Sequence, residues 1–187
     1  MKVLVIPEDQ ELDRYIVKPV VEAMFQDLEI RARIDVLPEP RLRGSSDALD
    51  PTMIADIIRN NPMIDLFLLV VDRDCDRASN TAKALARQAE HPGRLVACVA
   101  IQEIEVWMLA LYKDTLSVPF TTVRAECDPK ELWAALLLKE LGGDGPGRGR
   151  KKAMRKISGA WRSLRDTCVE LRDFEDTVRA WYMANRS

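Results

Sequence analysis

Residues 65–71 (DLFLLVV) restrict the fold of this chain more than any other segment. An apolar run of this length, without alternation between polar and apolar positions, is typical of a strand that is buried on both faces. Such strands lie inside a parallel sheet that helices cover on both sides. We therefore expect an α/β protein with this segment at the centre of its sheet.

Three other short apolar segments predict the remaining strands, and a helical pattern follows each of the four. The predicted strands besides the central one are residues 2–6 (KVLVI), 31–37 (RARIDVL) and 94–101 (RLVACVAI). Strands that alternate with helices are joined by right-handed crossovers, which place the strands parallel to one another. The sequence therefore predicts a mostly parallel four-stranded sheet flanked by helices.

The chain divides into an α/β part and a helical part. Residues 1–115 carry the alternating pattern, whereas residues 116–187 contain only helical patterns and a glycine-rich basic loop at 142–152. One of those helices is predicted to start at Asp128, where Asp-Pro-Lys-Glu forms a capping box. We expect the helical C-terminal region to pack on the α/β domain, because 187 residues suit one domain with a small addition.

Composition excludes several classes of site. The four cysteines form no C-x-x-C pair, so we expect reduced thiols and neither a disulfide framework nor a thiolate zinc site. His91 is the only histidine, which argues against histidine-based catalysis and leaves oxygen ligands for any metal. The chain lacks a signal peptide and any apolar run long enough to cross a bilayer, so we expect a cytoplasmic protein without membrane contact.

Acidic side chains follow three of the predicted strands. Glu8 comes after the first strand, Asp72 and Asp74 after the third, and Glu105 shortly after the fourth. If the first and third strands are neighbours, their carboxylates meet at one edge of the sheet, where a cation would relieve their repulsion. Oxygen ligands of this kind favour Mg²⁺ or Mn²⁺. A solvated position on the flank of its helix is the alternative for Glu105.

The same residues carry a resemblance to a known family. Glu8 after a strand, the D-x-D of Asp72 and Asp74, and residues 100–110 (AIQEIEVWMLA) resemble small bacterial Toprim-like proteins related to the nuclease domains of OLD-family proteins. The resemblance implies that Glu8 is a general acid/base, that Asp72 and Asp74 bind the metal, and that Glu105 is a further ligand. Asp9 stands where the family usually has glycine after the glutamate.

A glycine-rich basic segment, residues 142–156, could contact phosphates. It holds five of the eight glycines and six basic residues. Cationic side chains of this kind gain affinity for nucleic acids by displacing counterions, so the candidate contacts are Arg148, Arg150, Arg155 and Lys156. The family resemblance implies a cation near the scissile phosphate, for which Lys151 and Lys152 are the candidates. A solvated linker between helices is the alternative interpretation.

These features predict Mg²⁺-dependent hydrolysis of phosphodiester bonds in DNA or RNA, by a Toprim-type nuclease that would suit phage defence or DNA repair. Two alternatives stay open. One is a non-catalytic Toprim-like module that partners an ATPase. The other is a receiver-like phosphoacceptor domain, although Gln102-Glu103 follows the fourth strand where a receiver has Ser or Thr. The sequence leaves the oligomeric state, the number of metal ions and the cleavage specificity open.

Overall fold

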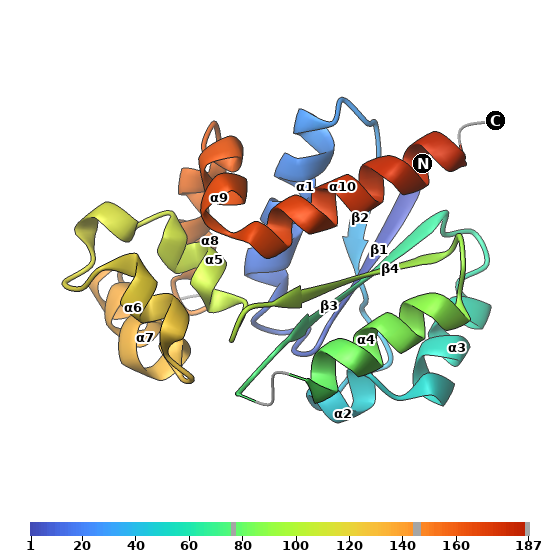
Figure 1. Ribbon diagram of the computed structural model, residues 1–187, viewed down its shortest axis with the longest axis horizontal. Helices are drawn as coiled ribbons and strands as arrows, with labels where there is room; N and C mark the ends of the chain where they lie inside the picture. Colours follow the sequence, from blue (N-terminus) through green and yellow to red (C-terminus); the bar gives the residue numbers. More distant parts are fainter. Residues whose placement is uncertain (76–77, 144–146, 186–187) are drawn as a thin grey trace.

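The centre of the molecule is a parallel sheet of four strands, as predicted. The computed structural model describes residues 1–75, 78–143 and 147–185. The strands are β1 (Lys2–Pro7), β2 (Arg33–Val36), β3 (Leu66–Asp72) and β4 (Leu95–Ala100). They lie in the order β2-β1-β3-β4, and every neighbouring pair is parallel (Figure 1). The apolar segment of β3 is therefore internal, and its residues from Leu66 to Val71 are fully buried.

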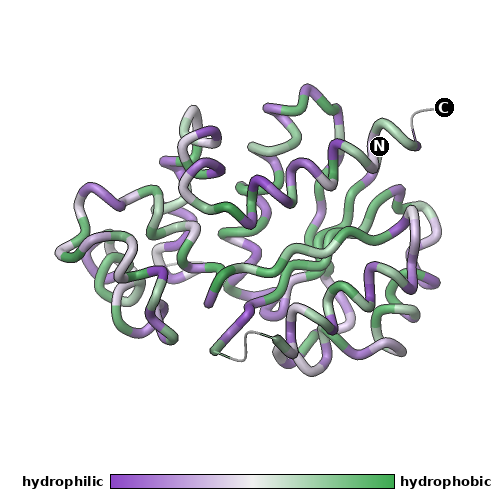
Figure 2. Tube along the Cα trace, in the orientation of Figure 1, coloured by the Kyte–Doolittle hydropathy of each residue, from purple (hydrophilic) through white to green (hydrophobic). Residues whose placement is uncertain are grey.

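Helices cover both faces of this sheet. One face packs against α1 (Arg14–Asp27) and α10 (Val169–Ala184), and the other against α3 (Pro51–Asn60) and α4 (Ser79–Glu90) (Figure 1). Side chains alternate between the two cores: Val3 and Val5 belong to the first, and Leu4 and Ile6 to the second. Figure 2 shows the strands as mostly hydrophobic and the helices as mixed. Burial on both faces explains why β3 lacks polar residues before Asp72.

Local sequence signals account for several helix boundaries. The side chain of Asp50 accepts a hydrogen bond from the amide of Met53 at 2.7 Å, and Pro51 occupies the first turn of α3, as is typical of a helix start. Proline lacks a backbone N–H and is expected to kink or restart a helix, but Pro19 lies inside the single helix α1. The helical pattern after the central strand predicts a helix from about Arg77 to Glu90; α4 covers Ser79–Glu90, and Arg77 lies outside the described residues.

The rest of the chain is helical, as predicted for the C-terminal region. Its elements are α5 (Glu105–Ala110), η1 (Lys113–Thr115), α6 (Phe120–Ala125), η2 (Lys130–Ala134), α7 (Ala135–Glu140), α8 (Arg150–Ala153), η3 (Met154–Ile157) and α9 (Trp161–Thr167), with a short α2 (Ser45–Ala48) earlier in the chain. Helix α10 then returns to the sheet, where Leu171, Phe174 and Val178 join its core. The C-terminal region thus completes the cover of the sheet. Among the helices that the structure describes, none has both the length and the apolar character to cross a membrane.

The cysteines differ from the expectation of four reduced thiols. Cys98 and Cys168 are buried free thiols, as predicted. Cys75 and Cys127, in contrast, form a disulfide, with Cα atoms 5.5 Å apart. The prediction was wrong for this pair because its two cysteines are 52 residues apart in the sequence, and spacing does not reveal which distant loops meet.

Candidate acidic site at the carboxyl ends of the strands

Glu8 and Asp72 meet where β1 and β3 end. The two strands are paired side by side, with Pro7 opposite Val70. An oxygen of Glu8 accepts a hydrogen bond from the amide of Asp72 at 2.9 Å. The spatial prediction that the first and third strands bring these residues together is therefore confirmed. Loss of solvation at this position raises the pKa of Glu8 to about 7, even though the bond from Asp72 favours the charged form.

Asp72 is also bound by the segment that follows β4. One carboxylate oxygen of Asp72 accepts a hydrogen bond from the amide of Ile104 at 2.8 Å, just beyond β4. Loss of solvation raises the pKa of Asp72 well above its ordinary value, and the nearby carboxylates of Glu8 and Asp13 raise it further. The Asp72 carboxylate therefore stands between two strand ends, where its negative charge is disfavoured.

Asp13 is a third member of this group that the sequence reading did not find. Its side chain is only 5% exposed and accepts a hydrogen bond from the amide of Asp9 at 3.0 Å. Burial raises the pKa of Asp13 to about 7, and the charges of Glu105 and Asp9 add to the effect. An Asp directly before a helix reads as an ordinary helix cap, so its position in the sequence concealed it.

One pocket of about 380 Å³ joins these carboxylates to three cations. Its walls comprise Glu8, Asp9, Gln10, Asp13, Arg41, Leu42, Arg43, Gly44, Asp72 and Lys130. Arg41 and Arg43 come from the loop between β2 and α2, and both are exposed. The acidic residues of the pocket thus come from the ends of β1 and β3 and from the segment before α1. Its cationic residues come from the loop after β2 and from η2.

Lys130 is the lysine that the fold brings to the pocket. Its backbone amide donates to a carboxylate oxygen of Glu103 at 2.8 Å, and its ammonium lies 4.0 Å from the Glu105 carboxylate. Burial opposes the charge of Lys130, but Glu105, Asp13 and Glu103 outweigh that effect and raise its pKa. Its place in a capping-box motif gave no sign of this role. The lysine is therefore charged at neutral pH beside the carboxylates.

Two predicted metal ligands have other partners in the structure. Asp74 has a left-handed backbone (φ 54°), and its carboxylate accepts a hydrogen bond from the side chain of Asn80 at 3.1 Å. Glu105 is 1% exposed and pairs with Arg150 at 2.5 Å. Asp74 is still close enough to raise the pKa of Glu8. In the structure Asp74 is therefore bound to Asn80, next to the acidic group. Glu105 is paired with Arg150 and lies near Lys130.

The basic segment is divided between the interior and the surface. Arg150 is only 3% exposed, so the guanidinium expected to contact nucleic acid is buried against Glu105. Lys151 and Lys152 are exposed on α8, and the ammonium of Lys152 donates to the carbonyl of Leu141 at 2.8 Å. The other predicted contacts, Arg148, Arg155 and Lys156, are exposed. Residues 144–146 of the glycine-rich loop lie outside the described residues.

The donor atoms of the acidic group suit a hard cation. Glu8, Asp13 and Asp72 offer carboxylate oxygens, which Mg²⁺ and Mn²⁺ prefer. Their raised pKa values show that the existing contacts leave their charges poorly compensated. Within residues 1–75, 78–143 and 147–185, however, no three Asp, Glu, His or Cys side chains are already arranged as a metal site.

The role of the pocket has to be inferred from its own chemistry. Neither a protein-family model, nor a curated protein, nor a solved structure matches this chain.

Proposed function

We propose that this protein hydrolyses phosphodiester bonds of DNA or RNA with the help of Mg²⁺ or Mn²⁺. The observation that carries the proposal is the meeting of Glu8, Asp13 and Asp72 with Lys130 in one pocket. Carboxylates with raised pKa values beside a charged lysine provide both a cation-binding surface and a phosphate-binding group. The D-x-D motif and the Toprim-like resemblance of the sequence point to the same chemistry.

Asp72 and Asp13 are the residues assigned to hold the cation. They come from different elements, and each accepts a backbone N–H through one oxygen, so the second oxygen of each carboxylate is the proposed ligand atom. A bound divalent cation would supply charge stabilisation for the phosphate. Asp74 would add a ligand only after leaving Asn80, whereas Glu105 is assigned to anchoring Lys130 and Arg150.

Glu8 is assigned to proton transfer. A carboxyl group with a pKa of about 7 is present in both protonation states near neutral pH, so it can accept a proton from water and later return one. The hydrogen bond from the Asp72 amide fixes one oxygen of Glu8 and leaves the other oxygen for this exchange. General acid–base groups of this kind contribute roughly 10²- to 10⁴-fold to rates.

The cations of the pocket are assigned to the nucleic acid. The ammonium of Lys130 lies beside the carboxylates, where it would stabilise negative charge on the attacked phosphate. Arg41 and Arg43 stand at the exposed side of the pocket and would contact neighbouring phosphates of the strand. The exposed Arg148, Arg155 and Lys156 offer a second surface for the backbone.

A cleavage assay with matched variants tests this proposal. Supercoiled plasmid and labelled single-stranded RNA are incubated with protein in Mg²⁺, in Mn²⁺ or in EDTA. We expect cleavage only with a divalent cation, and a loss of at least about a hundredfold for Asp72→Asn and Lys130→Met. Asp176→Asn, at an exposed position of α10, is the matched control and should cleave like the wild type.

The outcomes separate the candidate functions. Equal cleavage by the wild type and Asp72→Asn would remove the proposed site. No cleavage of either substrate, together with Mn²⁺ binding that Asp72→Asn abolishes, would favour the non-catalytic module over the nuclease.

A further inference from the structure

The disulfide joins the segment that follows Asp72 to the segment that precedes Lys130, and both of these residues line the acidic pocket. Cys75 directly follows Asp74, one turn of chain beyond the end of β3, and Cys127 lies three residues before Lys130. The Cα separation of 5.5 Å falls in the usual range for a disulfide. On one side of the bond is the loop with the D-x-D motif, and on the other is the segment with the lysine. The covalent bond therefore connects the chain three residues after Asp72 with the chain three residues before Lys130.

The two cysteines of this bond lie at the surface, in contrast to the other two cysteines. Cys75 and Cys127 are exposed residues, whereas Cys98 and Cys168 are buried free thiols. Exposed disulfides are the ones that reductants reach most readily, and they are frequently regulatory. A soluble dithiol would therefore act on the Cys75–Cys127 bond and leave the two core thiols unchanged.

The segment before Lys130 is loosely held between two fixed ends. Arg124 pairs with Glu170 at 2.8 Å and Pro129 is buried, so residues 125–128 are its weakly held part. Residues 125–128 are exposed or partly exposed, so they bury little apolar surface. Lys130 begins η2, where its amide donates a hydrogen bond to Glu103 and the amide of Leu132 donates to the carbonyl of Asp128. Segments with little buried surface open locally at a small free-energy cost. A covalent bond at Cys127 therefore has a large effect on where Lys130 lies.

We propose that the Cys75–Cys127 disulfide is a reversible redox switch that holds Lys130 at the acidic pocket. In the switching step a dithiol reductant supplies two electrons and two protons, the Cys75–Cys127 bond breaks into two thiols, and the reductant closes to its own disulfide. The oxidised protein keeps Lys130 beside Glu105 and Asp13. The reduced protein frees residues 125–128, so the start of η2 shifts and Lys130 moves away from the carboxylates of the pocket. This inference rests on the proposed function only for its effect on cleavage.

Three measurements on the full chain test the switch. Thiol titration of the denatured protein should find two free thiols before reduction and four after it. Hydrogen exchange at the amides of Lys130 and Leu132 should become at least about tenfold faster after reduction. Cleavage of nucleic acid should fall about tenfold under the same conditions. Cys75→Ser should match the reduced wild type and should not respond to the dithiol.

The outcomes distinguish this proposal from the nuclease proposal. Four free thiols without any reductant would overturn the switch, as would exchange rates at Lys130 that are the same in both redox states. Faster exchange with unchanged cleavage would also overturn it, since the bond would then be only a structural link. If neither redox form cleaves nucleic acid, the nuclease proposal fails, whereas the exchange rates still decide whether the disulfide holds Lys130.

Discussion

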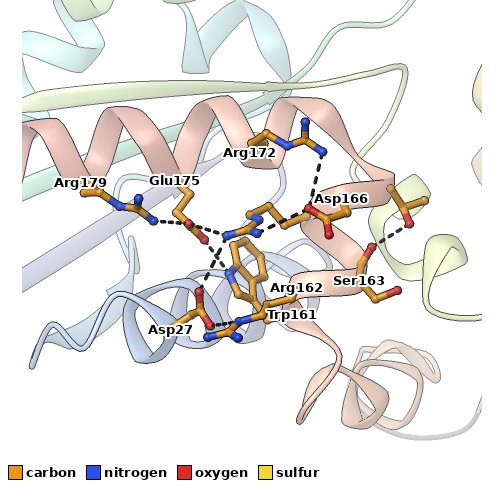
Figure 3. Close-up of polar contacts among 10 residues, drawn as sticks. Asp27, Trp161, Arg162, Ser163, Asp166, Arg172, Glu175 and Arg179 are labelled. Atoms are coloured by element: carbon orange, nitrogen blue, oxygen red, sulfur yellow. Dashed lines mark hydrogen bonds and ion pairs between the residues drawn. The ribbon is translucent and has the colours of Figure 1, made fainter.

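Glu175 and Asp13 are both buried carboxylates, but their surroundings are opposite. Glu175, 1% exposed on α10, accepts hydrogen bonds from the indole of Trp161 at 2.7 Å, from Arg165 at 2.9 Å and from Arg179 at 2.7 Å (Figure 3). Asp13 has one backbone donor and lies among other acidic groups. Two arginines compensate the charge of Glu175, whereas Lys130 opposes the raised pKa values of Glu8 and Asp13 only in part.

This difference separates a structural role from a chemical one. The ion pairs of Glu175 tie α10 to α9, and Arg165 extends the network toward Asp27 of α1 at 3.9 Å (Figure 3). A buried charge that is surrounded by donors stabilises one arrangement of helices. Poorly compensated carboxylates at the end of the sheet do the reverse, because their repulsion costs stability unless a proton or cation relieves it. The two regions should therefore respond to mutation, pH and metal in different ways.

The largest effect is expected at the compensated carboxylate. Glu175→Gln removes the charge that pairs with Arg165 and Arg179, so the free energy of unfolding should fall by about 3 kcal/mol. Urea denaturation followed by circular dichroism measures it. The matched control is Arg172→Ala, which removes an exposed pair with Asp166 and should change the stability by less than about 0.5 kcal/mol. Similar values for the two variants would show that the network around Glu175 does not stabilise the helices.

A smaller change in the free energy of unfolding is expected from the acidic pocket when the pH rises. The folded-state pKa values of Glu8 and Asp13 are raised to about 7 from 4.5 and 3.8, so the folded protein binds more protons than the unfolded chain between these values. The contribution of the two groups to stability is therefore greatest below about pH 4 and declines as the pH rises to about 7. Between pH 6 and pH 7 we expect a decline of roughly 2 kcal/mol for the two groups together.

The double variant Glu8→Gln/Asp13→Asn isolates that response. Its neutral side chains keep acceptor oxygens for the amides of Asp72 and Asp9, but they no longer titrate. The difference in unfolding free energy between variant and wild type should therefore grow from pH 5 to pH 7.5, in favour of the variant. A difference that does not change with pH would mean that these carboxylates are not strained by burial. Glu175→Gln, measured in parallel, should not reproduce the trend.

The sequence predicted the sheet and one half of the pocket for a physical reason. An apolar strand can be buried on both faces only in the interior of a parallel sheet, so the position of β3 followed from residues 65–71. Glu8 and Asp72 followed because adjacent parallel strands end at the same edge. That inference needed only which strands are neighbours.

The missed residues depend on contacts that no local pattern encodes. Asp13 and Lys130 stand at helix starts, where Asp and Lys have ordinary structural roles. Arg150 and Glu105 are separated by 45 residues, and their pairing depends on how the glycine-rich segment folds back onto α5. Gly149 supports that approach with a left-handed backbone (φ 87°) close to the carbonyl of Leu138. The composition of this segment suggested an exposed surface for nucleic acid. The burial of Arg150 could not be predicted, because it depends on the distant Glu105.

The smallest effect, and the sharpest separation of the two regions, is expected from a divalent cation. At pH 8 the carboxylates of Glu8 and Asp13 are ionised, so Mg²⁺ at about ten times its dissociation constant should raise Tm by about 3 °C. At pH 5.5 protons compete for the same oxygens, and the rise should be less than half as large. Differential scanning fluorimetry with NaCl of equal ionic strength as the control measures both shifts. Glu175→Gln should keep the full rise in Tm, because the network of Glu175 lies outside the pocket. Glu8→Gln/Asp13→Asn should lose the rise. The same rise in both variants would mean that the cation binds elsewhere.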